Sequence, residues 1–550
     1  MYYFSRFGLP RAPMAQILQF PVHIKIRMTM NRDNTVRALE DRERIWDVAV
    51  IGGGATGLGV AVDAATRGYS VVLFEQEDFA KGTSSRSTKL VHGGVRYLAQ
   101  GDVGLVFEAL RERGLLRRNA PHLVENEDFI IPCYRWWEKP FYTIGLTVYD
   151  LMAGRLGLGK SLPKKKSTVL KLIPTLRPDG LRGGVSYHDG QFDDARLAVN
   201  LAQTATDAGG MVMNYARVTG LLKEADGTVN GVRVEDRFTD RTYDVRARAV
   251  INATGVFVDS ILVMDNPEDK PMVRPSQGIH VVLDRSFLGG TSAVMIPKTD
   301  DGRVLFAVPW HGKVIVGTTD TLREHPELEP RPLEEEVNFI LDTAGRYLIR
   351  KPKRSDALSV FAGLRPLAAP KEEGKSTKEI SRSHKIIVSP SKLVTITGGK
   401  WTTYRKMAED TIDRAIRLNL LPDRRCETAH YPIHGYHEPT DFGSPLYFYG
   451  SDEQKVLAIK AERPDLGERL HPDYPYTGAE VVWAVHEEMA YTVEDVLARR
   501  LRMLLLDARA AIAMAPAAAR LMAQELGRDE RWQQEQVREF TRLAEGYLLK

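Results

Sequence analysis

The stretch "WDVAVIGGGATGLGVAVDAATRGYSVVLFEQED", residues 46–78, constrains the fold of this chain more than any other. A short apolar run enters a turn that carries Gly52, Gly54 and Gly57, and a segment at helical spacing follows. A second apolar run then ends at Glu75. Because parallel strands are buried on both faces and read as continuous apolar runs, this order predicts a strand, turn, helix and strand of a Rossmann-like α/β domain.

The glycine spacing predicts a binding site for the pyrophosphate of a dinucleotide. Gly52 permits a tight turn, Gly54 lets backbone N–H groups approach the phosphates, and Gly57 lets the helix pack closely on the strand. The N-terminus of the helix adds a partial positive charge. Glu75 is placed to accept hydrogen bonds from an adenosine ribose. A purely structural glycine turn is the alternative.

The segments that follow favour FAD over NAD. Residues 82–98, "GTSSRSTKLVHGGVRYL", begin where a nicotinamide enzyme would continue with another strand and helix. Their hydroxyl groups and Gly-Gly turn offer hydrogen-bond donors to a flavin and its phosphates. A later strand and turn, "INATG" at residues 251–255, adds a second close backbone approach. We therefore predict FAD as the cofactor.

The pattern along the chain predicts several domains, since 550 residues exceed what one core supports. Short strands with frequent turns between Pro271 and Val316 indicate an antiparallel sheet inserted into the first domain. Helical patterns dominate after about residue 425. The predicted parts are a disordered or mis-started leader (1–43), an FAD-dependent oxidoreductase unit (44–425) with a discontinuous FAD-binding domain and substrate-domain segments at about 130–185 and 270–355, and a C-terminal helical domain (426–550).

The beginning of the chain has no acidic residue before Asp33. Its basic residues are Arg6, Arg11, Lys25, Arg27 and Arg32. An organelle transit peptide is one interpretation of this composition. A leader that precedes a true start at Met30 is the interpretation that we favour, because the segment contains prolines and has weak periodicity.

Composition excludes several classes of function. The 76 basic and 72 acidic residues leave a net charge of +4, which implies no general nucleic-acid partner. The two cysteines fit a reducing compartment, and neither they nor the histidines have metal-site spacing. No uninterrupted apolar run approaches the roughly 20 residues that a membrane-spanning helix needs.

Seven segments in order resemble the FAD-dependent, membrane-associated glycerol-3-phosphate dehydrogenase family, within the D-amino-acid-oxidase-like flavoproteins. They are "DVAVIGGGATGLG", "GTSSRSTKLVHGGVRYL", "YHDGQFDDARL", "INATGVFVD", "VPWHGKVIVGTTD", "FAGLRPL" and "GGKWTTYRKMAED". The resemblance implies oxidation of sn-glycerol 3-phosphate to dihydroxyacetone phosphate, reduction of FAD, and transfer of the electrons to a membrane quinone.

Turns and resemblance together identify the residues expected to bind FAD. These are Gly52, Gly54, Gly57, Glu75, Thr83, Ser84, Ser85, Lys89, His92, Gly93, Gly94, Ala253, Gly255 and Gly399. The resemblance also implies a substrate pocket. Its expected residues are Arg96, Tyr97, Thr318, Arg365, Arg382 and Lys400.

A phosphate dianion requires converging cations, and the planar fork of arginine suits it. We expect Arg365 and Lys400 to take part in catalysis together with His280, the candidate base, because an unperturbed imidazole titrates near neutrality. A surface salt bridge is the alternative for each arginine. A hydrogen-bonded strand histidine is the alternative for His280.

Residues 131–166 interleave aromatic residues with basic ones, ending in Lys164, Lys165 and Lys166. Such a segment is typical of a peripheral anchor that lies on an anionic membrane surface. A core helix followed by a solvated loop is the alternative. We expect a cytoplasmic protein, peripheral to the cytoplasmic face of the inner membrane, and leave open whether it forms a homo-oligomer.

Three other functions remain open at this point. A glycerol-3-phosphate oxidase would use the same pocket with oxygen as the acceptor. A flavin amine oxidase would not need phosphate-binding arginines. A non-enzymatic flavin-binding regulatory protein would retain FAD without reacting with the substrate.

Overall fold

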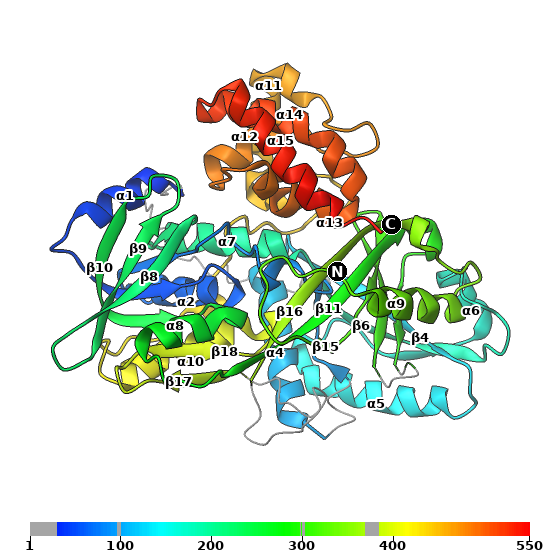
Figure 1. Ribbon diagram of the computed structural model, residues 1–550. Helices are drawn as coiled ribbons and strands as arrows, with labels where there is room; N and C mark the ends of the chain where they lie inside the picture. The colour runs from blue at the N-terminus through cyan, green and yellow to red at the C-terminus, as the bar shows by residue number, and fades with distance from the viewer. Residues whose placement is uncertain (1–29, 96–100, 298, 300–302, 369–383, 550) are drawn as a thin grey trace, which may run out of the picture.

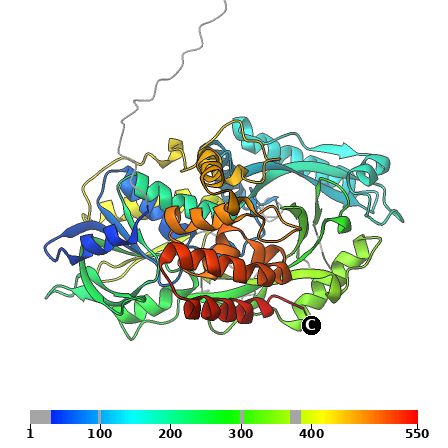
Figure 2. The ribbon, with the colours of Figure 1, turned by 90° about the horizontal axis from the view of Figure 1, so that it is seen from above.

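The computed structural model describes residues 30–95, 101–297, 299, 303–368 and 384–549. Two mixed sheets stand side by side, and the C-terminal helices lie over the region between them (Figures 1 and 2). This arrangement confirms the expected α/β class with an inserted antiparallel sheet and a C-terminal helical region.

The first sheet has the strand order β17-β18-β10-β1-β2-β7, and its central strands are parallel. Its strands are β1 (Ile45–Ile51), β2 (Val71–Phe74), β7 (Met211–Met213), β10 (Thr242–Asn252), β17 (Lys385–Val388) and β18 (Val394–Thr397). The carboxyl ends of β1 and β10 meet at one edge, where a doubly wound sheet binds its ligand.

Helix α2 (Ala55–Thr66) is held against β1 by a contact between backbones. A Cβ atom on Gly57 would lie 1.9 Å from the carbonyl oxygen of Gly52, so a side chain at this position would push the helix off the turn. Gly68, with φ +81°, reverses the chain after the helix. Helices α7 (Asp194–Asp207) and α10 (Tyr404–Arg417) flank α2.

An antiparallel ribbon extends the first sheet. Strand β9 (Val229–Asp236) pairs antiparallel with β10 and with β8 (Ala216–Lys223). The stretch from Gly210 to Val218 reads as one strand in the sequence. In the structure β7 and β8 are separate, because Tyr215 adopts φ +52° between them.

The second sheet has the order β15-β11-β14-β13-β12-β4-β6-β3, with β16 paired to β11 and β5 to β6. Its strands are β3 (Leu90–Val91), β4 (Val124–Cys133), β5 (Leu162–Lys164), β6 (Gly183–Phe192), β11 (Val273–Asp284), β12 (Ala293–Ile296), β13 (Leu305–Trp310), β14 (Lys313–Gly317), β15 (Thr321–Leu322) and β16 (Ala357–Ala368). All pairs except β4 with β12 are antiparallel. Strands β3 and β16 lie outside the segments expected for the substrate domain.

The register of the second sheet places several pocket residues in one row. His280 pairs with Gly317, and Gly317 pairs with Phe306 on its other side. A Cβ atom on Gly317 would lie 2.3 Å from the His280 ring, so the glycine leaves room for the imidazole over the sheet. Met295 pairs with Phe306 and continues the row.

The remaining helices fall into two groups. One group lies around the two sheets, and the other forms the C-terminal region. Around the sheets lie α4 (Val103–Asn119), α5 (Glu138–Ala153), α6 (Lys166–Leu172), α8 (Val258–Asp265) and α9 (Glu334–Tyr347). The C-terminal region contains α11 (Glu453–Glu462), α12 (Gly478–Glu487), a π-helical turn η10 (Asp495–Arg500), α13 (Met503–Leu506), α14 (Ala508–Leu526) and α15 (Glu530–Glu545). Within the described ranges, no helix is both long and apolar enough to span a bilayer.

Residues 30–43, which the sequence assigns to a leader, pack against the first sheet. Helix α1 (Arg32–Glu40) is capped by Asn31, and Arg32 forms a 2.6 Å ion pair with Asp236. Leu39 is buried in the core on that side. A buried ion pair and a buried leucine hold this segment against the sheet. Residues 30–43 therefore belong to the folded part of the chain. The rest of the expected leader, residues 1–29, lies outside the described residues.

A buried histidine makes the stability of the fold sensitive to acid. Burial, with smaller contributions from Arg196 and His434, lowers the pKa of His122 to about 3. Below pH 6.5, His122 therefore binds a proton in the unfolded chain but not in the folded chain. The free energy of unfolding falls as the pH drops from 6.5 towards 3.

We expect that lowering the pH from about 7.5 to about 5.5 costs the wild type about 1.4 kcal/mol more than it costs His122→Gln, which has no titrating ring. Urea unfolding of both proteins at the two pH values measures this difference. Equal pH dependence of the two proteins would show that His122 is not the source.

Candidate active site

One large cavity opens between the two sheets, with a volume of about 490 Å³. Its wall combines the glycine turn after β1, the loop between β2 and β3, strands β11 and β16, and the turn before α10. Segments that are far apart in the sequence thus surround one space.

Most of the site residues expected from the sequence lie on the wall of this cavity. They are Gly52, Gly54, Glu75, Thr83, Ser84, His92, Gly94, Ala253, Gly255, His280, Thr318, Arg365, Gly399 and Lys400. Four others, Gly57, Ser85, Lys89 and Gly93, are not among the wall residues. Arg96, Tyr97 and Arg382 lie outside the described residues.

The glycine turn forms a cradle that side chains would fill. Gly52 adopts φ +107°, and a Cβ atom there would lie 2.7 Å from the carbonyl oxygen of Ala253. Gly54 caps α2 without a side chain, so the first amides of the helix lie beside the cavity. A cradle of backbone amides at a helix N-terminus fits an anionic pyrophosphate, so these residues suit FAD.

Glu75 follows β2 on the cavity wall. Its carboxylate accepts hydrogen bonds from the amides of Gly53 at 2.6 Å and Glu77 at 2.9 Å. Burial raises the pKa of this carboxyl group to about 7, although the two amides oppose the shift. The two amides fix the carboxylate beside the glycine turn, where a ribose hydroxyl group could reach it.

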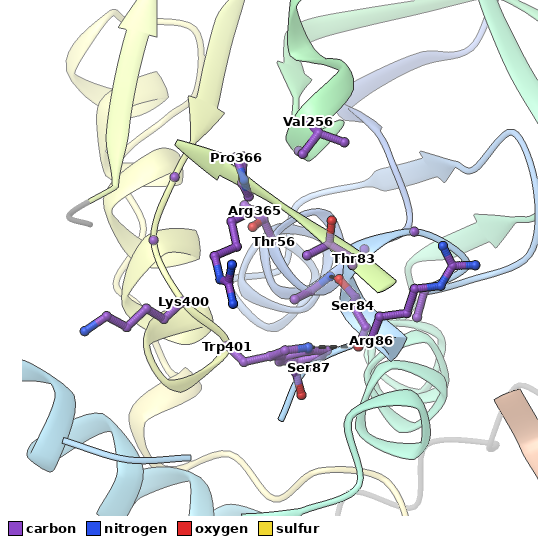
Figure 3. A pocket seen from close by; sticks show the side chains of 18 of the residues that line it. Thr56, Thr83, Ser84, Arg86, Ser87, Val256, Arg365, Pro366, Lys400 and Trp401 are labelled. Carbon is purple, nitrogen blue, oxygen red and sulfur yellow. Dashed lines mark hydrogen bonds between the residues drawn. The ribbon is translucent and has the colours of Figure 1, made fainter. Parts of the chain in front are cut away.

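The loop between β2 and β3 is tied to the other sides of the cavity. Ser84 Oγ accepts a 2.9 Å hydrogen bond from the amide of Ala55, and the carbonyl of Ser84 accepts one from Trp401 Nε1 at 2.9 Å. Thr83 Oγ1 donates to the carbonyl of Leu364 at 2.6 Å. Figure 3 shows Thr83, Ser84 and Trp401 around the same space.

Lys89 is buried in the protein interior and does not lie on the cavity wall. It is fully buried, and its Nζ donates to Asp194 Oδ1 at 2.6 Å and to the carbonyl of Ser85 at 2.6 Å. Burial lowers the pKa of Lys89, although Asp194 opposes the shift. A buried ammonium group needs a counter-charge, and satisfying that need turns Lys89 away from the cavity.

A buried hydrogen-bond chain supports the Gly-Gly turn of the flavin loop. The amide of Gly93 donates to Tyr149 Oη at 2.8 Å, and Tyr149 donates to Asp189 Oδ1 at 2.8 Å. Arg113 forms a 2.5 Å ion pair with the same carboxylate. The sequence indicated none of these roles. Asp189 lies inside the "YHDGQFDDARL" landmark, but nothing in the local pattern joins it to Tyr149 or Arg113.

Strands β11, β14 and β16 provide the cationic end of the cavity. Arg365 Nη2 donates to Thr318 Oγ1 at 3.1 Å, and its Nη1 lies 3.6 Å from Asp320. A Cβ atom on Gly278 would lie 2.3 Å from the guanidinium, so the glycine makes room for it. Arg365 and Thr83 lie between Lys400 and Arg86 in Figure 3. Arg365 thus lines the cavity, and the carboxylate that it faces, Asp320, lies on the cavity wall as well.

His280 lies on strand β11 of the second sheet, at the cationic end of the cavity. Its Nε2 is 2.9 Å from Thr88 Oγ1, and its ring stacks on Phe361 with the centroids 4.9 Å apart. Burial, with Arg365 and Lys89, lowers the pKa of His280 well below its usual value. The imidazole is therefore not the unperturbed one expected from the sequence, because burial beside two cations disfavours its charged form.

The other end of the cavity is apolar. Phe129 and Tyr187 stack with their centroids 5.1 Å apart, and Phe306 meets Phe129 edge to face at 6.1 Å. Met295 completes this part of the wall. Within the described part of the chain, no three His, Cys, Asp or Glu side chains are arranged to hold a metal ion.

The Rossmann-type sheet, the glycine cradle and the cavity beside an inserted sheet define the class of FAD-dependent oxidoreductases. A family model described as "FAD dependent oxidoreductase" matches residues 47–404. A second, described as "C-terminal domain of alpha-glycerophosphate oxidase", matches residues 392–535. FAD is therefore the cofactor.

The chain belongs to the FAD-dependent glycerol-3-phosphate dehydrogenase family. It is 40% identical to the mitochondrial glycerol-3-phosphate dehydrogenase of Arabidopsis thaliana over 91% of this chain and 86% of that one. The human mitochondrial enzyme is 39% identical over 91% of this chain and 74% of its own. The structure of the Bacillus halodurans glycerol-3-phosphate dehydrogenase with FAD superposes with a TM-score of 0.76, at 30% identity, covering 94% of this chain and 97% of that one.

The support beneath the Gly-Gly turn can be tested by removing one hydroxyl group. We expect Tyr149→Phe to lower the free energy of unfolding by about 1–3 kcal/mol, because the Gly93 amide and Asp189 lose a buried partner. Urea unfolding measures the loss. Tyr187→Phe is the matched control, because this equally buried hydroxyl group contacts the weak acceptor Met295 Sδ. Equal losses in the two variants would contradict the assigned support.

Proposed function

We propose that this protein oxidises sn-glycerol 3-phosphate to dihydroxyacetone phosphate and passes the electrons through FAD to a membrane quinone. The observation that carries the proposal is the placement of Arg365, Thr318 and His280 on one sheet floor, in the same cavity as the glycine cradle. A phosphorylated alcohol needs a cation and a proton acceptor close to the cofactor. The Arabidopsis and human relatives named above are called glycerol-3-phosphate dehydrogenases, which supports the substrate.

In this proposal Arg365 and Thr318 hold the phosphate or the adjacent oxygen of the substrate. Arg365 Nη2 and Thr318 Oγ1 already lie 3.1 Å apart, so an anion beside the pair would meet two adjacent donors. Lys400, on the same wall, adds a second positive charge. Arg96, Tyr97 and Arg382 remain part of the proposed substrate site on the family resemblance.

His280 is the proposed acceptor of the hydroxyl proton. FAD, when bound, supplies the acceptor for the hydride that leaves the substrate C2. Because burial disfavours the charged ring, the imidazole is neutral before the reaction and one of its ring nitrogens carries a lone pair. The same low pKa predicts that His280 passes the proton on rather than keeping it.

The acceptor is proposed to approach through helix α5. Its outward face exposes large apolar side chains, where an isolated soluble surface would carry polar ones. These are Phe141, Ile144, Val148 and Leu151, and the exposed Trp136 and Trp137 just precede the helix. Such a face suits the boundary between the headgroups and acyl chains of a bilayer, with the neighbouring lysines on anionic lipid.

The inner face of α5 leads towards the cavity. Leu146 and the partly buried Tyr142 pack in one cluster with Phe129, Tyr187 and Met295, which form the apolar end of the cavity wall. An apolar electron acceptor from the bilayer would thus meet apolar side chains along this side. This supports a quinone over oxygen, which needs no such contact.

We propose a location at the cytoplasmic face of the inner membrane. The Arabidopsis and human relatives are named as mitochondrial proteins, and fractionation of the source cells distinguishes a mitochondrial location from the proposed one. Homo-oligomer formation is left to a measurement of mass in solution.

The reaction is tested by mixing the purified yellow protein anaerobically with glycerol 3-phosphate. We expect the flavin absorbance to bleach, and glycerol or D-amino acids to leave it unchanged. His280→Ala should slow bleaching by about 10²–10⁴-fold with little change in substrate affinity. Arg365→Gln should instead weaken substrate binding by about 10- to 100-fold, because a charge-assisted hydrogen bond is lost.

Retained FAD without bleaching would favour the regulatory flavoprotein and contradict the proposal. Small effects of His280→Ala on both rate and affinity would remove His280 as the base. In air, hydrogen peroxide formed stoichiometrically with the oxidised substrate would identify oxygen as the acceptor.

The proposed membrane contact is tested by co-sedimentation with anionic vesicles. Each of Ile144→Ser and Leu151→Ser should lower the partition coefficient on the order of tenfold, because about 1.5–3 kcal/mol of apolar burial is lost. Charge reversal of the three lysines at 164–166 should also release the protein. The matched control is Leu457→Ser on α11, another exposed leucine. Unchanged partitioning of all the α5 variants would contradict the anchor.

A further inference from the structure

The C-terminal region holds the loop between β2 and β3 through a buried carboxylate. Asp78, near the start of this loop, is completely buried. It accepts hydrogen bonds from Arg499 Nε at 2.5 Å and from both terminal nitrogens of Arg500 at 2.5 and 2.9 Å. Burial would raise the pKa of Asp78, but Arg500 and Arg499 hold it at about 2. The carboxylate therefore stays charged across the physiological range.

A second contact joins the wall of the cavity to the same helical turn. Lys81 Nζ donates to both carboxylate oxygens of Glu494, at 2.8 and 2.7 Å. Glu494 also pairs with Arg499 at 2.7 Å, so this contact and the one to Asp78 share an arginine. Despite burial, Arg499 and Lys81 lower the pKa of Glu494 to about 2. Lys81 itself lines the cavity.

A third contact comes from the end of the chain. Arg86 Nη2 lies 2.5 Å from Glu329 and 3.2 Å from Tyr547 Oη, and Tyr547 donates to Glu329 at 3.0 Å. The carbonyl of Tyr547 accepts a 2.9 Å hydrogen bond from the amide of Val360 in β16. Tyr547 is therefore fixed at both its backbone and its side chain.

These contacts bracket the part of the loop that faces the cavity. Lys81 and Arg86 stand on either side of the turn η1 (Thr83–Ser85), and Thr83 and Ser84 lie on the cavity wall between them. Asp78 holds the chain just before. The turn is thus tied on both sides to residues that lie more than 400 positions further along the sequence.

We propose that the C-terminal helical region is a clamp that holds the 75–89 loop in the geometry that binds FAD. Glu494, Arg500 and Tyr547 are positioning residues, which act through Lys81, Asp78 and Arg86 and need no contact with the cofactor. A loop that is ordered before binding loses less conformational entropy when FAD binds, so the clamp raises affinity.

The chemistry of the interface supports a positioning role over one in stability alone. Taking charges out of water costs free energy that the ion pair only partly returns. An apolar contact of the same size would stabilise the fold equally well. Directional ion pairs add a fixed register, which is the position of one surface relative to the other. Here that register is set at Asp78, Lys81 and Arg86.

The test compares FAD binding to the full-length protein and its variants. Glu494→Gln and Tyr547→Phe keep the size of each side chain and remove the charge or the hydroxyl group that reaches the loop. Glu525→Gln is the matched control, because this carboxylate is similarly buried but pairs with Arg463 and His486 inside the C-terminal region.

We expect the FAD dissociation constant, measured by flavin fluorescence, to rise about tenfold in Glu494→Gln and Tyr547→Phe, which corresponds to about 1.4 kcal/mol. Amide hydrogen exchange in the cofactor-free variants should rise in residues 75–89. Exchange elsewhere in the chain should stay unchanged, because a general folding defect would raise it throughout. Glu525→Gln should change none of these.

Unchanged FAD affinity and loop exchange in both variants would overturn the clamp. Equal weakening by Glu525→Gln would also overturn it, because the effect would then be a general loss of stability. Flavin binding is measured without substrate or quinone. Failure of the proposed reaction would therefore leave this result intact, and failure of the clamp would leave the reaction intact.

Discussion

The close contact between the glycine turn and α2 is the constraint on which the rest of the site depends. Because no side chain stands between Gly57 and the carbonyl of Gly52, the helix packs directly on the turn. Its N-terminus then lies beside the cavity, where the positive end of the helix suits a pyrophosphate. The loop from β2, the second sheet and the turn before α10 contribute to binding and chemistry only because they are arranged around this fixed point.

Buried charges arrange those other segments. Lys89 with Asp194, Arg113 with Asp189, and Arg499 and Arg500 with Asp78 each join two distant parts of the chain. A buried charge without its partner is costly, so each pair tolerates little displacement. Tyr149, which is bonded to Asp189, supports Gly93. The C-terminal region holds the 75–89 loop at Asp78, Lys81 and Arg86. The helix that carries Tyr149 also exposes the apolar face proposed to meet the membrane, so the docking surface and the Gly-Gly turn share one rigid element.

Local patterns were sufficient to predict the glycine turn, the parallel strands and the inserted sheet, because strand and helix periods and turn residues act over a few neighbouring positions. Resemblance added Thr318, Arg365 and Lys400, and the structure brings all three to the cavity with His280. The domain boundaries and the roles of the individual site residues remain predictions. Lys89 shows the limit of the method: it lies in the expected loop, but its side chain faces Asp194, and the sequence carries no signal for that choice.

The sequence by itself determined which backbone turn can approach a dinucleotide, because only glycine fits there. Tertiary structure decided the properties that depend on surroundings. The pKa of His280 is set by burial beside Arg365, and the support of Gly93 comes from a tyrosine on another helix. The hold on the 75–89 loop comes from residues near the end of the chain. Desolvation and long-range hydrogen bonds act between residues that have no relation in sequence spacing, so only the folded chain defines them.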